Sequence, residues 1–201
     1  MSIRAVFFDF GGVIQRTEFQ APRQRLGQRF GMDYHDIDKL VFASESARQA
    51  TMGEITEDVH WVSVLKRLKR PAVELQPIKD EFFGGDVIDR ELVEFIRSLR
   101  RKFHVGLISN AWSGMREYLK RERLLDLFET TVISAEAGMM KPEARIYSIA
   151  LEQAGVKAEE AVFVDDVQVN IDACQQIGMK GVLFKDPQKA EEELKKILKI
   201  K

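Results

Sequence analysis

Cysteine, histidine and long apolar runs are scarce in this sequence of 201 residues. Its one cysteine, Cys174, excludes a disulfide framework and any zinc site built from several cysteines. Its three histidines are not spaced as a metal-binding cluster. The longest apolar runs, such as residues 5–8, are far shorter than the about 18 residues that a membrane-spanning helix needs. We therefore expect neither disulfides nor a membrane segment.

The chain also has almost no net charge, because 31 Lys and Arg residues face 32 Asp and Glu residues. Without an excess of positive charge, the sequence does not favour binding to nucleic acid or to an anionic membrane. Hydrophobic residues make up 45% of the chain, which is enough for a packed core and argues against disorder. Arg4 and Asp9 bracket the first apolar run, so we expect no signal peptide and a cytoplasmic location.

Short apolar runs alternate with helical patterns through the C-terminal half. Runs rich in β-branched and aromatic residues predict buried strands at residues 3–9, 103–108, 130–133, 161–164 and 180–184. Between them, apolar residues recur at helical spacing, for example within residues 92–99. This alternation predicts an α/β fold with a doubly wound, Rossmann-like parallel sheet covered by helices on both faces. Ligands bind such sheets beyond the carboxyl ends of the strands.

Residues 15–87 carry helical patterns and no convincing strand. Thr56, for example, can cap a helix whose first turn holds Glu57 and Asp58. We therefore predict a core of residues 1–14 and 88–201, with an all-helical cap of residues 15–87 inserted after the first strand. Such an insertion, hinged near the strand ends, is placed to act as a lid over a site. The alternative is a helical bundle that only stabilises the core.

Polar residues stand near the ends of these predicted strands: Asp9, Ser109, Lys141 and the pair Asp165 and Asp166. Taken singly, an acid or a serine there can be a helix cap, and the lysine can be a surface charge. A parallel sheet, however, brings all its carboxyl ends to one edge. The carboxylates would then suit Mg²⁺, which prefers oxygen ligands. A hydroxyl, an N–H group and a lysine suit phosphate oxygens, and an aspartate can attack phosphorus.

In order and spacing, this set resembles the haloacid dehalogenase-like hydrolase superfamily. The four motifs of that family are matched by FFDFGGVI, LISNAW, KPEARIY and VFVDDVQVN, which together span nearly the whole chain. The predicted insertion is similar to the helical cap of the family. Within the family, the sequence is most similar to sugar-phosphate phosphatases, including alpha-D-glucose-1-phosphatases, and to the phosphatase domain of bifunctional epoxide hydrolases.

The resemblance implies a role for each matched residue. Asp9 would be the nucleophile and a metal ligand. Ser109 and the backbone of Asn110 would hold the transferred phosphoryl group. Lys141 would neutralise charge on both the nucleophile and the phosphate.

The resemblance also implies a Mg²⁺ site. Its ligands would be Asp9, the backbone carbonyl of Gly11, and Asp166. Asp165 would be either an alternative ligand or a supporting carboxylate. Asn170 stands where relatives often carry a second acid, and it could hold a metal-bound water.

Gly11 is a departure from the phosphatase pattern, because relatives usually carry a second aspartate there as general acid and base. Losing a general acid costs about 10²–10⁴-fold in rate when the leaving group is poor. The carbonyl of Gly11 remains available to a metal, and some similar sugar phosphatases also carry glycine. We therefore expect a preference for aryl phosphates and anomeric sugar phosphates over alkyl phosphates.

Together, these features predict a Mg²⁺-dependent phosphatase that hydrolyses a small phosphorylated metabolite, such as a sugar phosphate, through an aspartyl-phosphate on Asp9. One alternative is a 2-haloacid dehalogenase, which uses the same nucleophile without a metal; such enzymes generally lack the carboxylates seen here at Asp165 and Asp166. Another is a weakened site, marked by Gly11, on a fold retained for partner binding. The sequence indicates no oligomeric state.

Overall fold

A computed structural model describes residues 2–200 and contains a five-stranded parallel sheet. The strands lie in the order β5-β4-β1-β6-β7. In chain order they are β1 (Ala5–Phe8), β4 (His104–Ser109), β5 (Thr130–Ile133), β6 (Ala161–Asp165) and β7 (Lys180–Leu183). All four pairings are parallel, and β1 is central, with β4 and β6 as its neighbours. The predicted α/β fold is confirmed.

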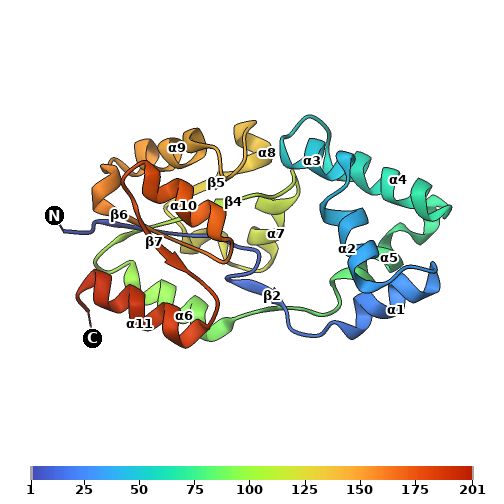
Figure 1. Ribbon diagram of the computed structural model, residues 1–201, viewed down its shortest axis with the longest axis horizontal. Helices are drawn as coiled ribbons and strands as arrows, with labels where there is room; N and C mark the ends of the chain where they lie inside the picture. Colours follow the sequence, from blue (N-terminus) through green and yellow to red (C-terminus); the bar gives the residue numbers. More distant parts are fainter. Residues whose placement is uncertain (1, 201) are drawn as a thin grey trace.

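Helices cover both faces of this sheet (Figure 1). The helices α6 (Arg90–Leu99) and α11 (Pro187–Leu198) lie on one face, and α9 (Ala144–Ala154) and α10 (Gln168–Gln176) lie on the other. Side chains alternate along β1: Phe8 belongs to the apolar cluster of α6 and α11, and Phe7 to that of α9 and α10. Two buried layers therefore hold the strand ends in place.

The segment between β1 and α6 is mostly helical and has an apolar core of its own. Its helices are α1 (Ala21–Arg29), α2 (Tyr34–Phe42), α3 (Glu45–Thr51), α4 (Glu57–Leu68) and α5 (Leu75–Phe83). Thr56 caps α4 as the sequence predicts, because its side chain accepts a hydrogen bond from the Val59 N–H. Trp61 and Phe82 are fully buried in this second core.

Two short strands correct the expectation of a segment without strands. The strand β2 (Gln15–Thr17) pairs antiparallel with β3 (Asp86–Ile88) where the chain enters and leaves the helical segment. Three residues are too few for an alternating apolar pattern, and the side chains of both strands are only partly buried or exposed. The ribbon joins the two ends of the insertion.

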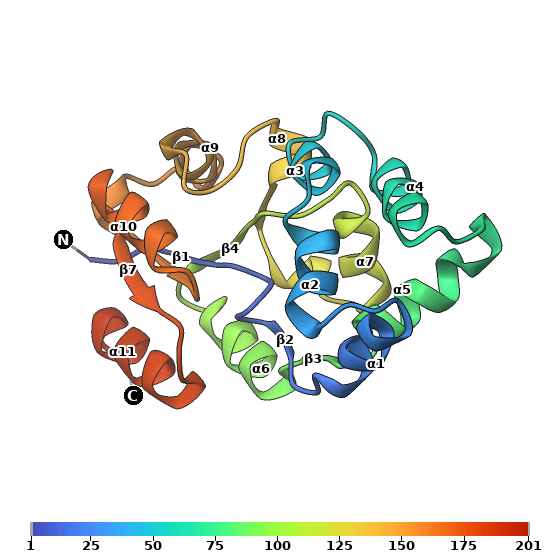
Figure 2. The same cartoon turned by 45° about the vertical axis from the view of Figure 1, so that its right-hand side comes forward.

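The remaining core helices lie near the boundary with the insertion. They are α7 (Met115–Arg121) and α8 (Ser134–Ala137). Figures 1 and 2 both show α3 of the insertion beside α8 of the core. This approach needs Gly53, where a Cβ atom would lie 2.1 Å from the carbonyl oxygen of Ala135. Within residues 2–200, no helix is long and apolar enough to cross a membrane.

Candidate active site

The carboxyl edge of the sheet gathers the acidic residues that the sequence singles out. Asp9 follows β1 directly, and Asp165 is the last residue of β6. The parallel register that pairs Phe8 with Val164 sets these two aspartates beside each other. Asp9, Asp165 and Asp166 each offer a carboxylate oxygen within 4.8 Å of the other two. The predicted convergence of acids at one edge is thus present in the structure.

Lys141 joins two of these carboxylates from the loop between α8 and α9. Its ammonium lies 2.9 Å from Asp9 Oδ1 and 2.7 Å from Asp165 Oδ2. The lysine is 1% exposed, so it is a buried charge held by two opposite charges. The alternative in which Lys141 is only a solvated surface residue is therefore wrong.

The surroundings of Asp9 raise the pKa of its carboxyl group above that of an exposed aspartate. Burial raises the pKa of Asp9 to about 6; the Lys141 ammonium opposes this shift, and the Asp165 carboxylate adds to it. Oδ1 of Asp9 accepts a hydrogen bond from the Phe10 N–H and forms an ion pair with Lys141. Within residues 2–200, no group donates a hydrogen bond to Oδ2, so this oxygen of Asp9 is available to a ligand.

Asp165 and Asp166 differ sharply in their surroundings. Both oxygens of Asp165 are occupied: the Val167 N–H donates to Oδ1, the Asn170 amide donates to both, and Lys141 contacts Oδ2. Tyr147 in turn donates its hydroxyl hydrogen to the carbonyl of Asn170. The amide nitrogen of Asn170 is thus bound to Asp165, and the metal-bound water at Asn170 stays a prediction.

The Asp166 carboxylate, in contrast, accepts no hydrogen bond from any other residue in the part of the chain that the structure describes. It packs against the backbone of Gly12, where a Cβ atom would lie 2.3 Å from the Asp166 carboxyl carbon. Burial raises the pKa of Asp166, and the negative charge of Asp165 raises it further. Of the two adjacent acids, Asp166 is the one with oxygens available to a ligand, and Asp165 supports Lys141.

Ser109 is the last residue of the neighbouring strand β4, and Asn110 follows it. The Ser109 side chain is buried, and its hydroxyl makes no hydrogen bond within residues 2–200. The Asn110 side chain bonds the backbone of Lys141 at 3.0 and 2.8 Å. The sequence suggested a role for the Asn110 backbone but not for its side chain, because no spacing rule relates a side-chain amide to a loop 31 residues away.

Gly11 has room for a side chain. A Cβ atom there would meet no atom within 4 Å, and the backbone does not adopt positive φ. Its carbonyl lies in the turn between Asp9 and β2, where Gly11 forms an isolated bridge with Gln15. Glycine at this position is therefore not required by the fold.

Trp112, which follows Ser109 by three residues, lies against the helical segment. Its ring is 4.6 Å from His60, 5.7 Å from Phe42 and 6.1 Å from Trp61, measured between ring centroids. The Glu57 N–H, at the first turn of α4, donates to the Ser113 hydroxyl. The loop that follows Ser109 therefore touches both the candidate site and the helical segment.

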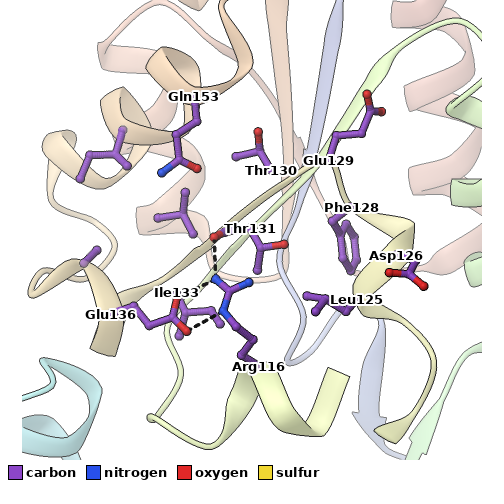
Figure 3. A pocket seen from close by; sticks show the side chains of 13 residues that line it. Arg116, Leu125, Asp126, Phe128, Glu129, Thr130, Thr131, Ile133, Glu136 and Gln153 are labelled. Carbon is purple, nitrogen blue, oxygen red and sulfur yellow. Dashed lines mark hydrogen bonds and ion pairs between the residues drawn. The ribbon is translucent and has the colours of Figure 1, made fainter. Parts of the chain in front are cut away.

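A separate hollow of about 580 Å³ runs along the outer edge of β5 (Figure 3). Arg116 lines this hollow and donates hydrogen bonds to the Glu136 carboxylate and to the carbonyl of Thr131. None of the residues that line it belongs to the aspartate and lysine cluster. The candidate catalytic residues are thus located at the carboxyl ends of the strands and not in this hollow.

Comparisons with known proteins identify the family of this chain. The family profile described as haloacid dehalogenase-like hydrolase matches residues 3–178. Bifunctional epoxide hydrolase 2 of Sus scrofa is 25% identical over 98% of this chain, which spans only 39% of that protein's length. A sesquiterpene phosphatase of Aspergillus oryzae is 26% identical, with 92% of this chain and 91% of that protein covered.

A solved structure has a similar fold. It is a HAD family enzyme of Bacteroides thetaiotaomicron in complex with magnesium and inorganic phosphate, with a TM-score of 0.77 and 22% identity. The similarity covers 90% of this chain and 94% of that one. At this identity the comparison shows a shared fold.

Proposed function

Because the chain belongs to the haloacid dehalogenase-like hydrolase family, we propose that it is a Mg²⁺-dependent phosphatase of a small phosphorylated metabolite. One observation carries the proposal. Asp9 has one oxygen held by Lys141 and the other free, and it lies beside the unpaired carboxylate of Asp166. This arrangement provides a nucleophile, a fixed cation and a metal site in one place.

The residues present fit a magnesium ion. Three carboxylates converge within 4.8 Å, and a single buried ammonium does not balance their charge. Oxygen donors of this kind are the ligands that Mg²⁺ prefers. Asp9, Asp166 and the carbonyl of Gly11 would hold the ion. When bound, Mg²⁺ would offset the negative charge that builds up when a phosphate approaches an aspartate.

In the proposed reaction, Asp9 attacks the phosphorus of the substrate. A bond forms between a carboxylate oxygen of Asp9 and phosphorus, and the bond between phosphorus and the leaving oxygen breaks. The leaving oxygen keeps the electron pair and takes up a proton from water to become the alcohol. Water then attacks the aspartyl-phosphate, which releases inorganic phosphate and restores the Asp9 carboxylate. The net reaction consumes one water and yields an alcohol and phosphate.

The phosphoryl oxygens would be held by groups at the end of β4 and by Lys141. The Ser109 hydroxyl and the Asn110 N–H are free of hydrogen bonds within residues 2–200. Donors fixed before the reaction stabilise charge without reorganisation in the transition state. Lys141 would stabilise both the nucleophile and the phosphate, since its ammonium already contacts Asp9.

Gly11 bears on the class of substrate. Without an acid at position 11, the leaving oxygen must depart with little help from a proton donor. Aryl phosphates and anomeric sugar phosphates meet this condition better than alkyl phosphates, because their leaving groups are more stable as anions. A similar protein of Bacteroides thetaiotaomicron is named D-ribitol-5-phosphate phosphatase. Its name supports a small phosphorylated metabolite as the substrate, but ribitol 5-phosphate is an alkyl phosphate, so the preference for better leaving groups rests on Gly11 alone.

We also propose that residues 15–87 form a cap over the site, with the core made of residues 1–14 and 88–201. The ribbon of β2 and β3 would be its hinge. A cap in this position can close over a substrate and exclude water while the phosphoryl group is transferred. The contacts of Trp112 and Ser113 with the helical segment support this division.

The test is phosphate release from p-nitrophenyl phosphate and from a panel of sugar phosphates that includes glucose 1-phosphate. Each substrate is assayed with Mg²⁺ and with EDTA, and Asp9→Asn serves as the control for contaminating phosphatases. We expect activity that requires both Mg²⁺ and Asp9. Turnover that persists in Asp9→Asn or in EDTA would refute the proposal. Metal-independent release of halide from 2-haloacids would point to a dehalogenase instead.

A further inference from the structure

The side chain of Asn110 bonds both backbone polar groups of Lys141. Asn110 Nδ2 donates to the Lys141 carbonyl oxygen at 3.0 Å, and the Lys141 N–H donates to Asn110 Oδ1 at 2.8 Å. A side-chain amide carries a donor and an acceptor, so it can pair with the N–H and C=O of one residue at the same time. This pair fixes the Lys141 backbone relative to the carboxyl end of β4.

The backbone position matters because the Lys141 ammonium has to meet two carboxylates in a buried site. Its long side chain has many rotamers, so the place of the ammonium depends on where the stem begins. Lys141 lies between α8 and α9, outside both helices. In the described chain, the other hydrogen bonds made by the backbone of residues 139–142 are local ones between Met140 and Glu143. Asn110 therefore provides the tie from the backbone of this loop to the end of β4.

We propose that the Asn110 side chain is a positioning residue for Lys141. It holds the Lys141 backbone at the end of β4 and thereby places the ammonium between Asp9 and Asp165. The inference rests on the proposed function, in which Lys141 neutralises charge on Asp9 and on the bound phosphate. It is separate from the role of the Asn110 N–H, because the backbone group and the side-chain amide are different atoms.

A competing role for the Asn110 side chain would be direct contact with substrate. The two roles differ in how the effect of removing the Asn110 side chain depends on Lys141. A positioning residue acts through Lys141, so its loss has little effect once the ammonium is gone. A substrate-binding residue acts by itself, so its loss has the same effect whether or not the ammonium is present.

A double-mutant cycle separates these roles. The affinity for inorganic phosphate is measured calorimetrically, with Mg²⁺ present, for the wild type, Asn110→Ala, Lys141→Met and the double variant. We expect Asn110→Ala to weaken phosphate binding about tenfold in the wild type and less than about twofold in Lys141→Met. Equal losses in the two backgrounds, or no loss in either, would overturn the inference.

Ser134 offers a matched control in the same part of the chain. Its hydroxyl accepts from the Ala111 N–H at 3.0 Å and donates to the Ala111 carbonyl at 3.1 Å. Ser134→Ala therefore removes two hydrogen bonds from the loop after β4, which also holds Asn110, without removing any contact of Lys141. We expect its effect on phosphate affinity to be independent of Lys141→Met. Coupling of Ser134 to Lys141 as strong as that of Asn110 would mean that general loosening of the loop, not positioning, explains the result.

A crystal structure of Asn110→Ala provides a readout that needs neither turnover nor the Lys141 variant. We expect the contact between the Lys141 ammonium and Asp9, 2.9 Å in the native chain, to be lost or lengthened. Asn110→Ser, which cannot span both backbone groups, serves if the alanine variant does not fold. An unmoved Lys141 would overturn the inference. If no phosphate ester is hydrolysed by the wild type, the proposed function fails, yet this structural outcome still decides whether Asn110 positions Lys141.

Discussion

At the scale of single residues, Gly11 and Gly12 are adjacent glycines with opposite constraints. Gly12 has φ of 77° and lies against Asp166, so a side chain there would be strained and would displace a proposed metal ligand. Gly11 has neither constraint: its φ is not positive and a Cβ atom would meet nothing within 4 Å. The fold therefore requires glycine at position 12 and permits other residues at position 11.

Gly11→Asp is expected to fold and to gain a proton donor for the leaving group. Turnover of an alkyl phosphate should rise about tenfold or more, with a smaller change for p-nitrophenyl phosphate, whose leaving group needs no proton. Steady-state kinetics on both substrates, with Gly11→Ala as the control for added bulk, measure the difference. No gain on the alkyl phosphate would mean that another group already supplies the proton.

The residues of the candidate site could be predicted where the type of each residue and its order along the chain were sufficient to identify it. Asp9 and Ser109 could be singled out because each stands at the end of a recognisable strand, and Lys141 because it lies in a matched family motif, although α8 separates it from β5. The sequence left open how Asp165 and Asp166 divide their roles, because both are aspartates and they are adjacent. The difference depends on contacts with Lys141 and Asn170, which lie on other elements. The side-chain role of Asn110 is hidden for the same reason.

At the scale of elements, the loop from β4 to α7 connects the candidate site to the helical segment. Ser109, the last residue of β4, precedes this loop, and three residues later Trp112 packs against His60, Phe42 and Trp61. Aromatic pairs at these distances stabilise by about 0.5–1.5 kcal/mol beyond the area they bury. Trp112 belongs to the core and packs against the apolar cluster of the insertion.

Trp112→Ala should loosen the insertion from the core without unfolding the sheet. Because Trp112 is only partly buried, we expect a loss of about 1–3 kcal/mol, below the range for fully buried tryptophan. Hydrogen exchange should increase in α2 and α4 while β1 stays protected, and Trp112→Phe should retain most of the protection. Equal loss of protection in β1 and in α4 would show that Trp112 supports the whole fold rather than the contact with the insertion.

The elements that the sequence predicted are those with a repeating apolar pattern. The five strands of the sheet and helices such as α6 have enough residues for the period to be visible. The strands β2 and β3 have three residues each, and their pairing joins segments about 70 residues apart, so the local sequence carries no sign of it. Such a ribbon forms because the two ends of the insertion lie side by side in the folded chain.

At the scale of the whole molecule, the parallel sheet concentrates negative charge at one edge. Asp9, Asp165 and Asp166 meet there with a single buried lysine, so the metal-free fold has an excess of negative charge inside it. Folding raises the pKa of Asp9 to about 6, mainly by burial. The metal-free fold should therefore lose stability as the pH rises from about 4 to about 6 and the carboxyl gives up its proton.

Magnesium should reverse this penalty and stabilise the folded chain in a pH-dependent way. At 100 times its Kd, an ion that binds only the folded state adds about 2.7 kcal/mol, which for a chain of this size raises Tm by about 5–10 °C. Because Mg²⁺ needs the deprotonated carboxylate, the increase should be full at pH 7.5 and should shrink as the pH falls through about 6.

Thermal unfolding with Mg²⁺ or EDTA at matched ionic strength measures this shift, and Asp166→Asn should abolish it. A shift of equal size at pH 5 and pH 7.5, or one that survives in Asp166→Asn, would show that the ion does not bind at the carboxyl edge of the sheet.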